Sequence, residues 1–153
     1  MATPPDPDGP VCEANFQFMK RCFDECVKNH QACNEKARRS KFVPTRLLDT
    51  GNWESSSAKL VEHHQLPPMD STDPQLQYAA LSYCWGDSLT LKTTKENKDE
   101  HEKVGILIYG MPATFQDAIK ITRELGIRYL WIDALCIVQW SKEDLEGCID
   151  FNV

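Results

Sequence analysis

The chain has 153 residues, of which 41% are hydrophobic and 26% are charged, and these proportions exclude global disorder and a collagen-like composition. Its 17 Lys and Arg against 23 Asp and Glu give a net charge of −6, which argues against nucleic acid as a partner, because phosphate binding requires a basic face. No apolar run approaches the roughly 18 residues of a membrane-spanning helix, so we expect no membrane partner. At this length one domain is expected.

Residues 1–10, MATPPDPDGP, predict a disordered leader, because four prolines and two aspartates stand among ten residues. They lack the basic and apolar regions of a secretory signal. The chain has seven cysteines, and without such a signal they indicate the reducing cytoplasm. There the cysteines are free thiols or metal ligands rather than disulfides.

Residues 11–77 predict a helix, a hairpin and a linker. Apolar side chains recur at three- and four-residue steps from residue 11 to about residue 39, which is typical of an amphipathic helix. Residues 45–49 (TRLLD) and 58–64 (AKLVEHH) predict two short strands that form a hairpin. The proline-rich stretch 66–74 predicts a linker.

The second half of the chain predicts a strand, a helix and a strand. Residues 78–84 (YAALSYC) form a nearly continuous apolar run, as in a strand covered on both faces. After a charged insertion within 87–110, a helix begins near Thr114, where TFQD resembles a capping box, and it ends at Gly126. Residues 128–133 (RYLWID) predict a second buried strand that continues into ALCIVQ. This βαβ unit implies parallel pairing, and because two strands alone leave exposed edges, we expect the chain to fold poorly.

Parallel pairing places the carboxyl ends of both strands at one edge of the sheet, where α/β proteins bind ligands. We therefore expect any ligand crevice to be formed by Trp85, Gly86, Asp87 and Asp133. Trp85 would supply a flat apolar wall, Gly86 would allow the turn, and the two aspartates would make polar contacts. The structural alternative is that Asp133 caps the following turn and that Asp87 belongs to a turn.

The cysteine-rich helix is expected to bind no metal. Cys22, Cys26, His30 and Cys33 are zinc-ligand types, but they lie along a single predicted helix. At the helical rise, Cys22 and Cys33 are roughly 16 Å apart, so these residues supply at most half a site. We expect them to pack as small apolar groups.

No catalytic residue is predicted. The candidate nucleophiles are Cys84, Cys136 and Cys148, and the candidate bases are His63, His64 and His101. No local motif joins any such pair, and cysteine is among the most buried residue types, so packing is favoured. The sequence also holds no phosphate-binding glycine motif and no HExxH.

Two blocks of the sequence resemble the heterokaryon-incompatibility (HET) domain of filamentous fungi. Residues 78–87 read YAALSYCWGD and residues 111–139 read MPATFQDAIKITRELGIRYLWIDALCIVQ. They match the family's YxALSYCWG and LPxTxxDAIxxxxxLGxRYLWIDxLCIxQ blocks nearly residue for residue. A cysteine-bearing helix and PTRLLD, here residues 44–49, commonly precede these blocks in such proteins.

The resemblance implies a role in non-self recognition, with programmed cell death when incompatible hyphae fuse. It also implies a flavodoxin-like parallel sheet, through a remote similarity of the family to Toll/interleukin-receptor (TIR) domains. We expect a non-catalytic interaction module in the cytoplasm, which associates with itself or with other proteins of an incompatibility pathway. The alternative is a TIR-like enzyme that binds or hydrolyses NAD and is active only when the domain is complete. NAD is the only cofactor that the resemblance suggests.

Residues 78–153 match only the N-terminal part of that domain. The family continues as CIxQDD, whereas here Gln139 is followed by Trp140 and Ser141, and Leu145 stands where a tryptophan is expected. Residues 147–153 (GCIDFNV) match no block of the family. We therefore expect a truncated form, and the sequence does not choose between a truncated gene model, a degenerate paralogue and a natural short form.

Overall fold

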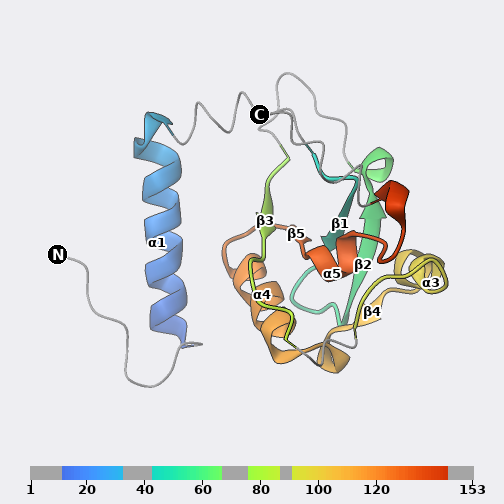
Figure 1. Ribbon diagram of the computed structural model, residues 1–153. Helices are drawn as coiled ribbons and strands as arrows, with labels where there is room; N and C mark the ends of the chain where they lie inside the picture. Colours follow the sequence, from blue (N-terminus) through green and yellow to red (C-terminus); the bar gives the residue numbers. More distant parts are fainter. Residues whose placement is uncertain (1–11, 33–42, 67–75, 87–90, 145–153) are drawn as a thin grey trace.

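The computed structural model describes residues 12–32, 43–66, 76–86 and 91–144, and in these ranges helices flank a five-stranded sheet (Figure 1). The elements in chain order are α1 (Glu13–Asn29), β1 (Arg46–Asp49), β2 (Ser57–Glu62), the 3-10 turn η1 (His63–Gln65), β3 (Tyr78–Ala80), α3 (Lys98–Lys103), β4 (Ile106–Leu107), the 3-10 turn η2 (Ile108–Gly110), α4 (Ala113–Glu124), β5 (Tyr129–Trp131) and α5 (Asp133–Cys136). The α/β class expected from the sequence is confirmed.

The sheet is mixed, with strand order β3-β5-β1-β2-β4. Strands β3 and β5 pair in parallel, with Tyr78 opposite Tyr129, as the βαβ pattern predicts. Strand β1 is antiparallel to both β5 and β2, and β4 is antiparallel to β2. The expectation of a parallel sheet was therefore wrong beyond the β3–β5 pair.

The predicted hairpin supplies the antiparallel strands. Strands β1 and β2 pair as expected, but the hairpin does not merely precede the sheet, because β1 lies between β2 and β5 at its centre. Leu47 and Leu48 point to opposite faces of β1, and both are fully buried. The expectation of poor folding assumed two strands with open edges, and the five-stranded sheet removes that reason.

The strand predicted over residues 78–84 is shorter and more exposed than expected. Only Tyr78–Ala80 form β3, which lies at an edge of the sheet and is partly exposed. Residues 81–86 continue without strand structure, although the Leu81 N–H still donates to the Trp131 carbonyl over 2.9 Å. The apolar composition of residues 78–84 thus predicted a strand covered on both faces, whereas β3 is an edge strand of the sheet.

The second predicted strand also ends early. Strand β5 stops at Trp131, and ALCIVQ does not extend it, because Asp133–Cys136 turn into the short helix α5. Trp131 itself is half-buried and packs against the smaller core cluster around Leu47. The main core lies between α4 and the sheet.

Helix α4 presents the apolar face that its periodicity predicts. Phe115, Ala118, Ile119 and Thr122 are buried on it, and the first three pack with residues of β1 and β5. The predicted capping box is not formed, because the residue before the helix is Pro112 and no side chain caps its first turn. Beyond the helix end, Gly126 has the positive φ, +74°, that was expected of it.

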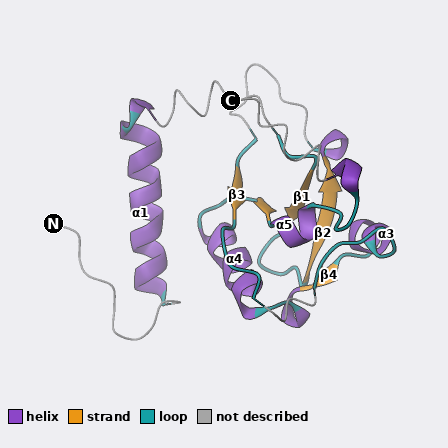
Figure 2. Ribbon diagram, in the orientation of Figure 1, coloured by secondary structure: helices purple, strands orange, loops and turns teal. Residues whose placement is uncertain are grey.

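Helix α1 stands beside the rest of the molecule (Figure 2). Phe16 is buried, and the Lys120 ammonium of α4 lies 5.0 Å from the centre of its ring. The helix ends at Asn29, earlier than the predicted residue 39, and residues 33–42 lie outside the described ranges. The leader 1–10 and most of the linker 66–74 also lie outside them. In the described ranges, no helix has the length and apolar character needed to cross a membrane.

Candidate functional site

Asp133 and Trp85 meet at the carboxyl edge of the β3–β5 pair. The Trp85 indole N–H donates to the Asp133 Oδ2 atom over 2.6 Å. Asp133 is the first residue of α5, and its Oδ1 atom accepts the Ala134 backbone N–H over 2.7 Å. Both carboxylate oxygens are therefore engaged, one with the helix start and one with the indole.

Of the other two residues predicted for this edge, the structure describes Gly86. Its φ of +63° is a left-handed conformation, which glycine adopts readily. A Cβ atom at Gly86 would meet no heavy atom within 4 Å, so this turn lies in open space. Asp87 lies outside the described residues. The predicted crevice as a whole stays a prediction, with Trp85 and Asp133 in direct contact.

Tyr83 is a member of this group that sequence reasoning missed. Its ring meets the Phe115 ring edge to face, with centroids 5.2 Å apart, so the core of α4 fixes its position. Burial and the nearby charge of Asp133 raise the pKa of the Tyr83 hydroxyl. The hydroxyl oxygen is buried and, within the described residues, makes no hydrogen bond of good geometry, even to that carboxylate. Tyr83 thus presents a protonated donor beside Asp133.

A set of backbone and side-chain bonds holds α5 in place. The Gln139 side-chain amide donates to the carbonyls of Asp133 and Ile137 over 3.1 and 3.0 Å. The Thr93 N–H donates to the Ala134 carbonyl over 2.9 Å, and the Gln139 N–H donates to the Thr93 carbonyl over 2.8 Å. The last residue of the second sequence block, Gln139, therefore has a structural role that fixes Asp133.

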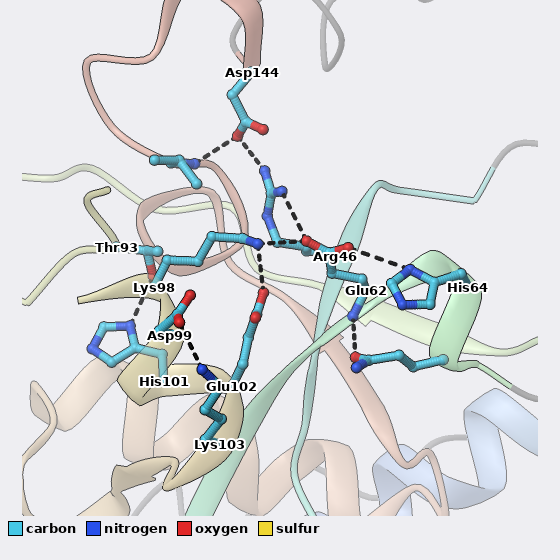
Figure 3. A network of polar contacts seen from close by, with 12 residues as sticks. Arg46, Glu62, His64, Thr93, Lys98, Asp99, His101, Glu102, Lys103 and Asp144 are labelled. Carbon is cyan, nitrogen blue, oxygen red and sulfur yellow. Dashed lines mark hydrogen bonds and ion pairs between the residues drawn. The ribbon is translucent and has the colours of Figure 1, made fainter. Parts of the chain in front are cut away.

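A partly buried ion-pair network lies next to this support (Figure 3). Arg46 of β1 is only 4% exposed, and its Nε–H donates to the Cys136 carbonyl over 3.0 Å. Its guanidinium pairs with Asp144, which also accepts the Val138 N–H over 2.6 Å, and its Nη1 atom lies 3.9 Å from Glu62. The network therefore ties β1 and β2 to the segment that follows α5.

Glu62 extends the network to α3. Its Oε1 atom lies 2.6 Å from the Lys98 ammonium, which is also 2.9 Å from Glu102 (Figure 3). The hydrogen bond from Lys98 lowers the pKa of Glu62, and the same bond raises the pKa of Lys98. These charged groups are mutually paired, which indicates a structural rather than a chemical role.

The candidate nucleophiles and bases are dispersed. Cys136 is 1% exposed, whereas Cys84 is exposed, and Cys148 lies outside the described residues. His101 is buried with its Nδ1 atom 3.0 Å from the Thr93 hydroxyl, and the His64 Nδ1 atom lies 3.3 Å from Glu62. In the described part of the chain, no histidine is hydrogen-bonded to Cys84.

The cysteine-rich helix is described only in part. Cys22 and His30 are exposed on the outside of the molecule, Cys26 is half-buried, and Cys33 lies outside the described residues. In the ranges described, no three His, Cys, Asp or Glu side chains are grouped so that they could hold a metal ion.

Comparison with known proteins identifies one family. The model of the heterokaryon incompatibility protein (HET) family matches residues 78–150. This range begins at β3 and contains Trp85, Asp133 and both sequence blocks, so the resemblance inferred from those blocks is confirmed. No curated protein and no solved structure matches the chain.

Proposed function

We propose that this chain is a protein-interaction module of fungal non-self recognition, because residues 78–150 match the model of the heterokaryon incompatibility family. In this proposal the module binds a protein of the incompatibility pathway, or a second copy of itself, and the contact signals programmed cell death. It has no catalytic step of its own. The carrying observation is the contact between Trp85 and Asp133.

The contact supports binding better than catalysis. Asp133 accepts hydrogen bonds from the Trp85 indole and the Ala134 backbone N–H, so its carboxylate holds the indole against the start of α5, which is a positioning role. The same bond restrains the indole ring, which is 39% exposed. A restrained, partly exposed tryptophan loses little conformational entropy when a partner covers it, and tryptophan is enriched among the residues that dominate interface energies.

The test is a death assay in a filamentous fungus that expresses the whole chain. Trp85→Ala is expected to abolish growth arrest, because it removes the restrained ring and leaves the bond between Asp133 and the Ala134 N–H at the start of α5. The matched control is Trp140→Ala, since Trp140 is 74% exposed and lies outside the Trp85–Asp133 contact. Circular dichroism of the purified variants checks that both retain the fold.

Two outcomes would contradict the proposal. Normal death signalling by folded Trp85→Ala protein would show that the ring does not bind the partner. Release of nicotinamide from NAD by the purified chain would instead support the TIR-like enzyme alternative. Asp133→Ala separates the roles further, because it frees the ring without removing it, and a partial loss of signalling is expected.

A further inference from the structure

A hollow of about 470 Å³ lies at the opposite end of β5 from Asp133. Its walls are the loop between β1 and β2 and the turn between α4 and β5, and they include Trp53, Arg123 and Arg128. The volume falls within the roughly 300–1,000 Å³ of small-molecule sites. Trp85 and Asp133 do not line it, so it is separate from the proposed interaction site.

Arg123 brings to this hollow a positive charge that no carboxylate of the described residues compensates. Its Nε–H donates to the Thr50 carbonyl over 3.1 Å, and its Nη2 group bonds to the same oxygen and to the Ser55 carbonyl. Burial lowers the pKa of Arg123, so the cation is partly desolvated. Among the described residues it pairs with no carboxylate, and these bonds leave the two Nη1 hydrogens unused. The guanidinium is thus fixed in position, and its Nη1 hydrogens and its positive charge are available to a ligand.

The second arginine does not share this property. Arg128 binds Asp49 through two parallel bonds, Nε to Oδ1 over 3.0 Å and Nη2 to Oδ2 over 2.8 Å. The pair is neutral overall. No acidic side chain of the described residues lines the hollow, so Arg123 makes the net charge of its lining positive. An anion that enters the hollow would therefore meet the Arg123 guanidinium, which hydrogen bonds hold in place, rather than a mobile side chain on the surface.

Trp53 gives the hollow a flat apolar wall. Its side chain is 55% exposed, although the loop that carries it is well ordered by its own bonds. The Asn52 side-chain oxygen accepts the Glu54 N–H over 3.1 Å and the Ser55 hydroxyl over 2.9 Å. The loop conformation therefore does not depend on the indole. An exposed indole near a cation suits a planar ring that carries an anionic group.

We propose that this hollow binds a small aromatic anion, with its ring against Trp53 and its carboxylate or phosphate on the guanidinium of Arg123. The ring supplies apolar contact, and the anionic group balances the charge of Arg123, which has no carboxylate partner in the described part of the chain. The site works independently of the interaction proposed for Trp85.

Calorimetric titration of the whole chain with 1-naphthyl phosphate and with 1-naphthoate tests the proposal and distinguishes the two anionic groups. Binding of at least one of them is expected. The separate halves, 1-naphthol and inorganic phosphate, should each bind at least about tenfold more weakly, a difference of about 1.4 kcal/mol. Equal binding of phosphate alone would reduce the hollow to a simple anion site and overturn the role of the ring.

Variants locate the site. Trp53→Ala and Arg123→Gln are each expected to weaken binding about tenfold or more, whereas Trp140→Ala and Arg21→Gln, which remove an exposed indole and an exposed guanidinium elsewhere, should leave it unchanged. If Arg123→Gln disturbs the loop, Trp53→Ala still tests whether the ligand binds in the hollow, because the exposed Trp53 ring adds little to the stability of the fold. No binding by the parent chain, or unchanged binding by Trp53→Ala, would overturn the proposal.

Discussion

Gly51 and Gly86 adopt nearly the same backbone conformation in different surroundings, with φ of +68° and +63°. A Cβ atom at Gly51 would lie 2.4 Å from the Ser55 hydroxyl oxygen, whereas one at Gly86 would meet nothing within 4 Å. We therefore expect Gly51→Ala to cost about 2–3 kcal/mol of unfolding free energy and Gly86→Ala about 1 kcal/mol, the conformational cost alone. Urea unfolding measures both. Equal losses would mean that Ser55 moves aside freely.

At the same scale, the sequence predicts that some residues of the candidate site lie together, and it misses others for physical reasons. Trp85 and Asp133 were placed at one edge because parallel strands must end together, and the structure joins them by a hydrogen bond. Tyr83 was missed because it lies within the apolar run 78–84, which predicts a buried strand, and nothing in that pattern distinguishes its hydroxyl group. Arg46 was missed because the pattern around it predicted only a strand, and its partner Asp144 lies 98 residues later in the chain.

Elements were predictable where the period of the sequence sets them, and their partners were not. The apolar face of α4 follows directly from its helical spacing, and the β1–β2 hairpin follows from two short strands with a turn between them. Nothing in a local pattern says that β1 pairs with β5 as well, because strand pairing depends on contacts that are distant in sequence. The mixed pairing of the sheet could therefore not be predicted from the sequence, although each of its longer strands was expected.

Helix α3 carries a buried histidine that makes its packing depend on pH. Burial lowers the pKa of His101 below its ordinary 6.5, so the unfolded chain takes up a proton at a higher pH than the fold does. Stability is then expected to fall as the pH drops below about 6.5. The pKa values of Asp49 and Glu62 are lowered, so these two groups also make the fold less stable on acidification. Their effect sets in only as the pH approaches and falls below their ordinary pKa values of 3.8 and 4.5. The interval between pH 7 and pH 5 therefore reports chiefly on His101.

Chemical unfolding at pH 7, 6 and 5 measures this dependence. His101→Gln should flatten the decline, and His30→Gln, which replaces an exposed histidine just after α1, serves as the control. An unchanged slope in His101→Gln would assign the decline to other groups.

Across the whole molecule, the segment before the HET match and the match itself build one sheet. Strand β1 lies between β5 and β2 in the sheet. Its Arg46 bonds to Cys136 and Asp144, which are distant from it in sequence. Because Arg46 is buried, removal of its partner Asp144 would leave the guanidinium with less compensation, and such a change commonly costs several kcal/mol. The segment that follows α5, which is joined to the Trp85–Asp133 site through Gln139, is thus held by residues that the HET match does not include.

This arrangement predicts that residues 76–153 do not fold by themselves. Without β1 and β2 the β3–β5 pair has an unpaired edge, and the core loses Leu48, Ala58 and the other side chains that the hairpin supplies. Residues 43–153, which lack only α1 and its surroundings, should still unfold cooperatively, because Phe16 is the one buried residue of that helix. Burial of the Phe16 side chain alone contributes about 1.5–3 kcal/mol. Thermal unfolding followed by circular dichroism compares the two fragments, and a cooperative transition in a monomeric sample of residues 76–153 would show that the HET match folds independently of the hairpin.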